Sequence, residues 1–379
     1  MEQEPKKAPR LRRWGTLALL AAMGLYLGCS LAPAPGGAVP ASAPAAALLQ
    51  APVQTVVSAA GTGTGKTVIP LGKAVGIKLF SDGVLVVGLS SVETAAGSCS
   101  PGRDCGLKEG DVITHINGDE VDTIEQVQAV VARQRDTPLT IQAVRGQKQL
   151  QLTASAAETS RGEYQLGVWL RDSMAGIGTL TFYDPASGIF AALGHGINDV
   201  DTAMLMPLES GSIMPASVSD VKKGESGQPG ELHGQFDLTT DLGTLYANTQ
   251  LGIFGQMPLE NLQTERSPVP VAARAEVEEG PAVILSNIRG DEVEQFDITI
   301  TKLYGQGEGN RDLMLQVTDP ELLAATGGIV QGMSGSPILQ NGKLVGAVTH
   351  VLVNDPTRGY GILAEEMFRQ ATGSQAQIS

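Results

Sequence analysis

Residues 332–349 read GMSGSPILQNGKLVGAVT, a glycine-rich turn followed by the pattern of a β-hairpin. Two apolar runs, Ile338-Leu339 and Leu344–Thr349, are separated by Asn341-Gly342, the dipeptide that most favours a two-residue hairpin turn. Short strands bounded by turn residues are typical of sandwiches and barrels. This stretch therefore predicts an all-β fold around it.

The same pattern extends over residues 160–379. Further short strand-like runs are residues 177–183, 282–286, 297–303 and 314–317. The chain has 47 glycines and 21 prolines but only 4% aromatic residues, which favours turns and short strands over long helices. We therefore expect a mostly β domain over this region.

The turn that contains Ser334 has the residues that nucleophilic catalysis needs. A serine hydroxyl is a weak nucleophile at neutral pH, so it requires a base to take its proton and backbone donors that stabilise the oxyanion. We expect the N–H groups of Gly332 and Ser334 to form this oxyanion hole, because small neighbours let the backbone coil tightly. The alternative is an ordinary glycine-rich hairpin connection.

A second glycine-flanked motif, Ala192–Ile197, contains His195. Taken alone, a histidine of this kind is often buried only to satisfy a hydrogen bond. The order histidine then serine, with a wide separation, is similar to that of two-barrel, chymotrypsin-like peptidases, although such triads recur on unrelated folds. The resemblance implies that one barrel supplies His195 as general base and the other supplies Ser334 as nucleophile.

Residues 106–121, GLKEGDVITHINGDEV, resemble the core of a PDZ domain, and the resemblance covers about residues 74–155. A helix is expected after Thr123, a plausible N-cap, with one apolar face. PDZ domains add an extended peptide to a sheet edge and hold its carboxylate on a loop of backbone N–H groups. The residues expected to bind peptide here are Gly76, Ile77, Lys78 and Leu79.

The N-terminus predicts a membrane anchor. Residues 1–13 are basic and should stay in the cytoplasm, residues 14–33 are apolar enough to span a bilayer, and residues 34–73 are an Ala/Pro/Gly-rich flexible linker. A cleaved signal peptide, or a lipoprotein signal at Cys29, are the alternatives. All three place the rest of the chain outside the cytoplasm.

Several other classes are disfavoured. The net charge of −14 argues against nucleic acid as a partner. No metal or cofactor is expected, since metal-ligand spacings are missing from the sequence and GTGTGKT (61–67) lacks the first glycine of a phosphate-binding loop. Cys99 and Cys105 are close enough in sequence to be considered for a disulfide after export.

Four segments of the chain are similar to the stage IV sporulation protein B peptidase family. They are residues 169–184, 194–202 (GHGINDVDT), 222–232 (KKGESGQPGEL) and 328–362, preceded by the PDZ module. The resemblance implies that His195 is the base, Ser334 the nucleophile and Asp319 the acidic third member. Asp199 and Asp201, close behind His195, are rivals for the acid, or simply shape the loop.

The resemblance also implies a biological role. Members of the family act in endospore-forming bacteria, in the space between the forespore and mother-cell membranes. They cleave themselves near the N-terminus and then cut a membrane-bound regulator of an intramembrane metalloprotease, which activates a sigma factor. The protein partners implied here are that regulator and the chain's own N-terminal segment. The alternatives are an envelope quality-control protease and a non-catalytic PDZ scaffold.

Overall fold

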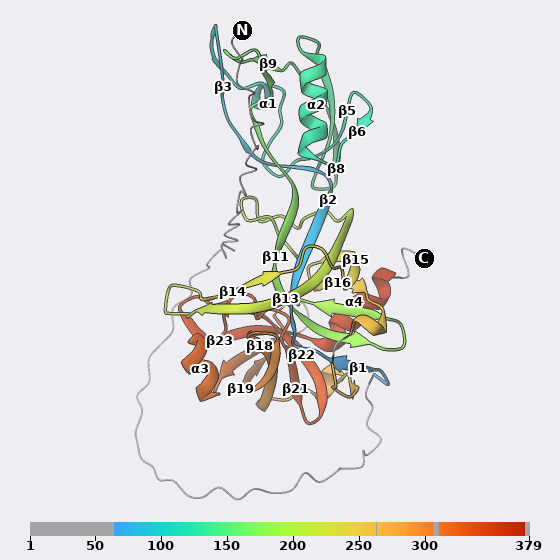
Figure 1. The fold of residues 1–379 in the computed structure, drawn as a ribbon, viewed down its shortest axis with the longest axis vertical. Coiled ribbons are helices and arrows are strands. Elements are labelled where there is room, and N and C mark those ends of the chain that lie inside the picture. The colour runs from blue at the N-terminus through green and yellow to red at the C-terminus, as the bar shows by residue number, and fades with distance from the viewer. Residues whose placement is uncertain (1–63, 263, 306–310, 376–379) are drawn as a thin grey trace, which may run out of the picture. The chain divides into compact units, whose positions relative to one another are not determined.

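The computed structural model describes residues 64–262, 264–305 and 311–375. The expected cytoplasmic flank and anchor, residues 1–33, lie outside these ranges. None of the helices in the described ranges is long and apolar enough to cross a bilayer. The described chain is mostly β, as the sequence predicts, and its strands are arranged in two circuits and a PDZ-like unit (Figure 1).

The first circuit, called here the first ring, has six antiparallel strands whose pairings close on themselves. In ring order its strands are β2 (Ala74–Leu89), β11 (Val168–Asp184), β12 (Ile189–Ala192), β16 (Gly252–Gln256), β15 (Gly243–Thr249) and β13 (Ser210–Lys222). Side chains alternate along each strand, so Val75, Ile77 and Leu79 all point to one buried side. There Val75 and Ile77 share a core with residues such as Phe190 and Ile253.

The second circuit is a closed six-stranded barrel. In barrel order its strands are β18 (Gly280–Arg289), β19 (Glu292–Leu303), β20 (Leu313–Val317), β23 (Asp355–Leu363), β22 (Lys343–Leu352) and β21 (Pro337–Gln340). The hairpin expected around Asn341-Gly342 is the β21–β22 connection. Counted along the chain, the strands of both circuits follow the same order, 1-2-3-6-5-4. Six-stranded closure pairs every edge, so neither circuit leaves an open sheet.

The remaining elements of the peptidase part cover or extend these circuits. They are β1 (Thr67–Pro70), β14 (Glu231–Phe236), η1 (Leu259–Asn261), β17 (Val269–Pro270), η2 (Arg274–Glu276), α3 (Pro320–Thr326) and α4 (Ala364–Gln375). The linker was expected to extend to residue 73, but strand β1 belongs to the folded part of the chain. Val68, Ile69 and Leu71 are buried, and residues 69–70 pair with β11. The strand was not predicted because it is short and follows a long stretch of small residues.

The PDZ-like unit is inserted into the first ring between its first and second strands. Strand β2 pairs within the ring up to Phe80 and then pairs with β5 (Val112–Ile116) through Val84 and Leu85. Strand β11 returns beside β2 along most of its length (Figure 1). The two parts therefore share two continuous strands.

Two helices and seven further strands complete the PDZ-like unit. They are β3 (Val92–Thr94), β4 (Gly97–Cys99), α1 (Pro101–Asp104), β6 (Asp119–Glu120), α2 (Ile124–Gln134), β7 (Leu139–Arg145), β8 (Lys148–Ala154), β9 (Ala157–Glu158) and β10 (Tyr164–Gln165). The predicted N-cap is confirmed, since the Thr123 hydroxyl accepts from the Gln126 N–H at 3.2 Å in a complete capping box. The α2 residues Val127, Val130 and Val131 are buried in the unit's core. Cys99 and Cys105 are free thiols.

The expected peptide-binding loop is not formed by residues 76–79. Ile77 pairs with Gly176 of β11 on one side and with Ile213 of β13 on the other, and its neighbours are paired likewise. Both edges of this segment are therefore occupied, and no free N–H row remains to receive a peptide carboxylate. Gly76, Ile77, Lys78 and Leu79 are instead the middle of a ring strand, whose alternate apolar residues belong to the peptidase core.

Candidate active site

Ser334 lies in a tight turn between α3 and β21. Gly332 and Gly335, on either side, have φ angles of 96° and 98°, in the left-handed region that glycine tolerates. A Cβ atom at residue 335 would lie 2.1 Å from the carbonyl oxygen of Thr179, so only glycine fits there. Met333 is fully buried in the core of the second barrel and anchors the turn.

The turn leaves two of its N–H groups unengaged. Three others donate to carbonyl oxygens: Met333 to Val330 at 3.1 Å, Gly335 to Val348 at 2.8 Å and Ser336 to Met333 at 2.9 Å. Within the described ranges, the N–H groups of Gly332 and Ser334 donate to no acceptor. These are the two donors that the sequence assigned to an oxyanion hole.

Thr179 of β11 joins the serine turn to the histidine motif. Its hydroxyl donates to the Gly332 carbonyl at 2.7 Å and its N–H donates to the Ser334 carbonyl at 3.2 Å. The carbonyl of the same residue accepts from the Leu193 N–H at 3.2 Å. One residue of the first ring thus holds both segments in place.

His195 follows β12 after a kink in which Leu193 and Gly194 have φ angles of 69° and 68°. Its Nδ1 lies 2.9 Å from the carbonyl oxygen of Gly196. A carbonyl only accepts, so Nδ1 carries the proton and Nε2 keeps a free lone pair. Burial lowers the pKa of His195, although the bond to Gly196 opposes the shift. The imidazole is therefore neutral at pH 7 and able to act as a base.

Strand β22 brings the two motifs together at Thr349 and His350. The Ser334 hydroxyl donates to the Thr349 carbonyl at 2.7 Å. The ring of His350 packs against that of His195, with centroids 5.0 Å apart and planes tilted by 37°. In this conformation the serine proton points to a backbone carbonyl, and no hydrogen bond joins Ser334 to His195 among the described residues.

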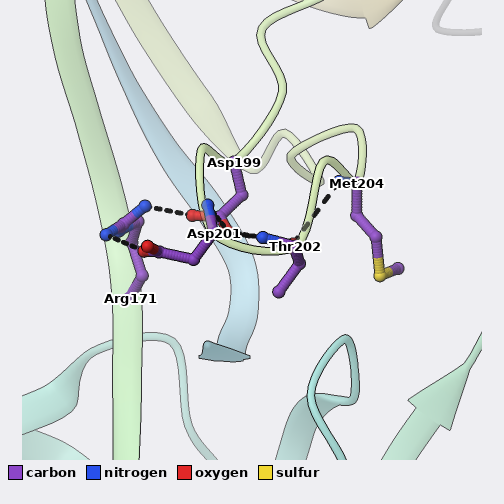
Figure 2. A network of polar contacts seen from close by, with 5 residues as sticks. All are labelled: Arg171, Asp199, Asp201, Thr202 and Met204. Carbon is purple, nitrogen blue, oxygen red and sulfur yellow. Dashed lines mark hydrogen bonds and ion pairs between the residues drawn. The ribbon is translucent and has the colours of Figure 1, made fainter. Parts of the chain in front are cut away.

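The loop after His195 is fixed by an arginine from β11, as Figure 2 shows. Arg171 forms ion pairs with Asp199 and, at 2.7 Å, with Asp201. The Asp199 side chain is fully buried and also accepts from the N–H groups of Asp201 and Thr202 and from the Thr202 hydroxyl. These contacts shape the loop, and neither carboxylate contacts His195.

Asp319, the acid that the family resemblance suggests, caps helix α3. Its carboxylate accepts from the N–H groups of Glu321 at 2.9 Å, Leu322 at 3.0 Å and Asp297 at 3.2 Å. The first two bonds are typical of an N-cap, and the third joins the cap to β19. In the described structure Asp319 has no contact with His195, and its catalytic role stays a prediction.

Sequence reasoning missed three residues that hold the site. Thr179 lies in an apolar strand and gives no signal, and Arg171 is one charged residue in a long strand. Asn248 is the third: its Oδ1 accepts from the Ile197 N–H at 2.8 Å, and its Nδ2 donates to the carbonyls of Ile197 and Met206. All three act across the tertiary structure, so no local pattern marks them.

Comparison with known proteins identifies both parts of the chain. Residues 94–145 match a PDZ domain. No curated protein matches. Among solved structures, the PDZ domain of an SdrC-like protein from Listeria monocytogenes is 24% identical, covering 24% of this chain and 87% of its own, with a TM-score of 0.20.

Two further structures are similar to about half of this chain. The active form of the Rv3671c protease of M. tuberculosis is 15% identical, covering 53% of this chain and 74% of its own, with a TM-score of 0.29. An inactive form is 16% identical, covering 54% and 84%, with a TM-score of 0.28. Residues 162–368, more than half of the sequence, match the SpoIVB peptidase S55 family. The chain therefore belongs to the SpoIVB peptidase S55 family of serine proteases and carries a PDZ domain.

Proposed function

We propose that this chain is a serine endopeptidase in which His195 is the general base, Ser334 the nucleophile, and the N–H groups of Gly332 and Ser334 the oxyanion hole. The observation that carries the proposal is the pair of unengaged N–H groups in the turn that presents Ser334. Backbone donors without an internal acceptor, beside a serine hydroxyl, are what an acyl-transfer intermediate requires.

The strand order supports a chymotrypsin-like arrangement of two barrels. The first ring and the second barrel share the order 1-2-3-6-5-4, and each contributes one motif. His195 follows the third strand of the first ring, and Ser334 precedes the fourth strand of the second barrel. The resting hydrogen bond from Ser334 to Thr349 must break before the proton can pass to Nε2 of His195.

We place this activity on the outer side of a membrane during sporulation, in the space between forespore and mother cell. Family membership supports this role, and so does the N-terminal sequence, in which a basic segment and an apolar stretch precede a small-residue linker. The substrates that we propose are the linker of the chain itself and a membrane-bound regulator of an intramembrane metalloprotease. A PDZ domain beside the peptidase part suits the capture of protein substrates.

Mass spectrometry of new N-termini tests the proposal directly. We expect the full-length wild-type protein to produce shortened forms whose N-termini lie before residue 67, where β1 begins, and Ser334→Ala to remain full length. A fluorophosphonate probe should label wild type at Ser334 only. Equal cleavage in Ser334→Ala would show that another protease makes the cuts, and a lack of probe labelling in cleaving wild type would reject the serine mechanism.

Digestion of unfolded casein separates a dedicated regulator-cleaving enzyme from a general one. A dedicated peptidase should leave casein largely intact while it cuts its own linker. Broad digestion at a comparable rate would favour envelope quality control and contradict the narrower substrate proposal.

A further inference from the structure

Residues 222–232 form the tip of the β13–β14 hairpin, and the mechanism above gives this segment no role. The hairpin is attached to the first ring through β13, yet its tip contacts the second barrel at three places. The Gly224 N–H donates to the Thr326 carbonyl at the end of α3, at 2.8 Å, and the Gly227 N–H donates to the Val353 carbonyl between β22 and β23, at 2.8 Å. The third contact is with the turn that presents the nucleophile.

This third contact engages both backbone groups of Gln331. Its N–H donates to the Gly230 carbonyl at 2.9 Å, and its carbonyl accepts from the Leu232 N–H at 2.9 Å. The two segments thus form a short parallel bridge between Glu231 and Gln331. The next residue in the chain is Gly332, the first of the two donors assigned to the oxyanion hole. The hairpin therefore holds the residue immediately before that donor.

The bond from Leu232 fixes the direction of the Gly332 N–H. The Gln331 carbonyl and the Gly332 N–H belong to one peptide unit, which is planar and trans, so the two groups point in opposite directions. Because the carbonyl is turned toward the Leu232 N–H, the Gly332 N–H points away from the hairpin. There it donates to no acceptor within the described ranges, and it is available to a substrate oxyanion.

The second donor of the oxyanion hole is held in a different way. The Ser334 N–H shares its peptide unit with the Met333 carbonyl, which accepts from the Ser336 N–H at 2.9 Å. That bond lies within the turn itself. The bond from Leu232 instead comes from a hairpin of the first ring, so only the Gly332 donor depends on a distant segment.

The peptide unit before Gly332 needs such a restraint because glycine lets it turn over. The φ of Gly332 is 96°, and a flip of the unit would carry this angle into the ordinary negative region, which is unstrained. The flip would also place the Gln331 carbonyl oxygen where the donor had been. An oxygen there repels an oxyanion instead of stabilising it.

We propose that the backbone N–H of Leu232 is the positioning group of the oxyanion hole, through which the β13–β14 hairpin sets one of its two donors. The inference rests on the proposed function. The Leu232 side chain is buried in the core of the second barrel with Val330 and Met333, which anchors its N–H beside the turn. A Cβ atom at residue 332 would lie 3.0 Å from the Leu232 Cβ, so the two backbones are in close contact.

The test compares fluorophosphonate labelling rates of the full-length chain and its variants. Leu232→Pro removes the N–H, and we expect labelling to be about 100-fold slower, the scale of losing one oxyanion donor. Leu232→Ala keeps the N–H but loses the side chain beyond Cβ, and its rate should stay close to that of wild type. Gln228→Ala, at an exposed residue of the same loop, is the control and should label normally.

Two further readouts separate positioning from loss of folding. A misplaced donor slows labelling but leaves its end point unchanged, and the pH at which the rate is half-maximal should not move because His195 is intact. A partly unfolded protein would instead label only a fraction of its chains, at the wild-type rate. Proline also fixes φ, so a second variant changes the N–H alone: leucic acid, incorporated at residue 232 by nonsense suppression, replaces it with an ester oxygen. The same slowing is expected.

Two results would overturn the inference. One is a wild-type labelling rate in the ester variant, whatever the proline variant does. The other is equal slowing in Leu232→Ala and the ester variant, which would assign the effect to side-chain packing. Both leave the peptidase itself standing, whereas failure of wild type to label at Ser334 would remove the proposed function instead.

Discussion

The ion pair between Arg171 and Asp199 gives the sharpest test of how the histidine loop is held. Arg171→Met keeps most of the side-chain length but removes the charge, which leaves the fully buried Asp199 carboxylate without its cation. Breaking a buried pair in this way typically costs about 3–5 kcal/mol. Asp199 retains three other donors, from Asp201 and Thr202, so we expect the lower end, about 3 kcal/mol.

Urea unfolding followed by circular dichroism measures the loss, and Arg289→Met is its control. Arg289 pairs with Glu294 at the surface, with 64% of its side chain exposed, so its removal should cost no more than about 1 kcal/mol. Since the loop follows His195 directly, the fluorophosphonate labelling rate of Arg171→Met should also fall, by about 10- to 100-fold.

A double-mutant cycle tests whether the stability lost in Arg171→Met comes from the ion pair with Asp199. In Asp199→Asn the buried charge is gone, so adding Arg171→Met should cost much less than it does in wild type. Equal losses in the two backgrounds, or equal losses for Arg171→Met and Arg289→Met, would refute the idea that this buried pair holds the loop.

Three further predictions follow from the structure. Gly335→Ala should abolish labelling of Ser334, because the alanine Cβ atom would lie 2.1 Å from the Thr179 carbonyl oxygen and a φ of 98° is strained for alanine. Normal labelling of this variant would contradict the geometry of the turn. Thr123→Ala should lower the free energy of unfolding by about 1 kcal/mol through loss of the α2 cap, as measured by urea titration. Ser219→Ala, at an exposed serine, is the control. Equal unfolding free energies for the two variants would mean that the cap contributes nothing. The pKa values of His195 and His350 in the folded state lie below the unfolded value near 6.5. The contribution of these neutral histidines to stability is therefore present above pH 6.5 and is lost as pH falls toward 3. The melting temperature should drop between pH 7 and 5, and His350→Phe should show a smaller drop.

The local parts of the fold and site follow closely from sequence patterns. The Asn341-Gly342 hairpin, the Thr123 cap and the apolar face of α2 each depend on residues a few positions apart, whose conformational preferences are intrinsic. The glycines around Ser334 are of the same kind, since φ angles near 97° exclude most other residues wherever the turn lies. These features can be predicted without knowing which other segments of the chain pack against them.

Interpretation failed where one sequence pattern suited two environments. The run Ala74–Leu79 is compatible with a PDZ loop or with a ring strand, and only its pairing with β11 and β13 decides. An aspartate before a proline and a helix suits an N-cap as well as a catalytic acid; Asp319 makes the capping bonds, and its catalytic role stays a prediction. The strand that contains Val68 and Ile69 was not predicted, because it is short and the strand it pairs with lies far along the chain.

The sequence by itself determined the family, the mostly β composition of the fold, and the two glycine-flanked motifs around His195 and Ser334, because turns and strand periodicity depend on near neighbours. Only the tertiary structure decided that the PDZ domain interrupts the first ring, that Arg171 and Thr179 hold the segments around His195 and Ser334, and that a second histidine packs against the first. Each of these contacts joins residues from distant parts of the chain. Packing of the whole core, rather than any local conformational preference, decides which distant segments come together.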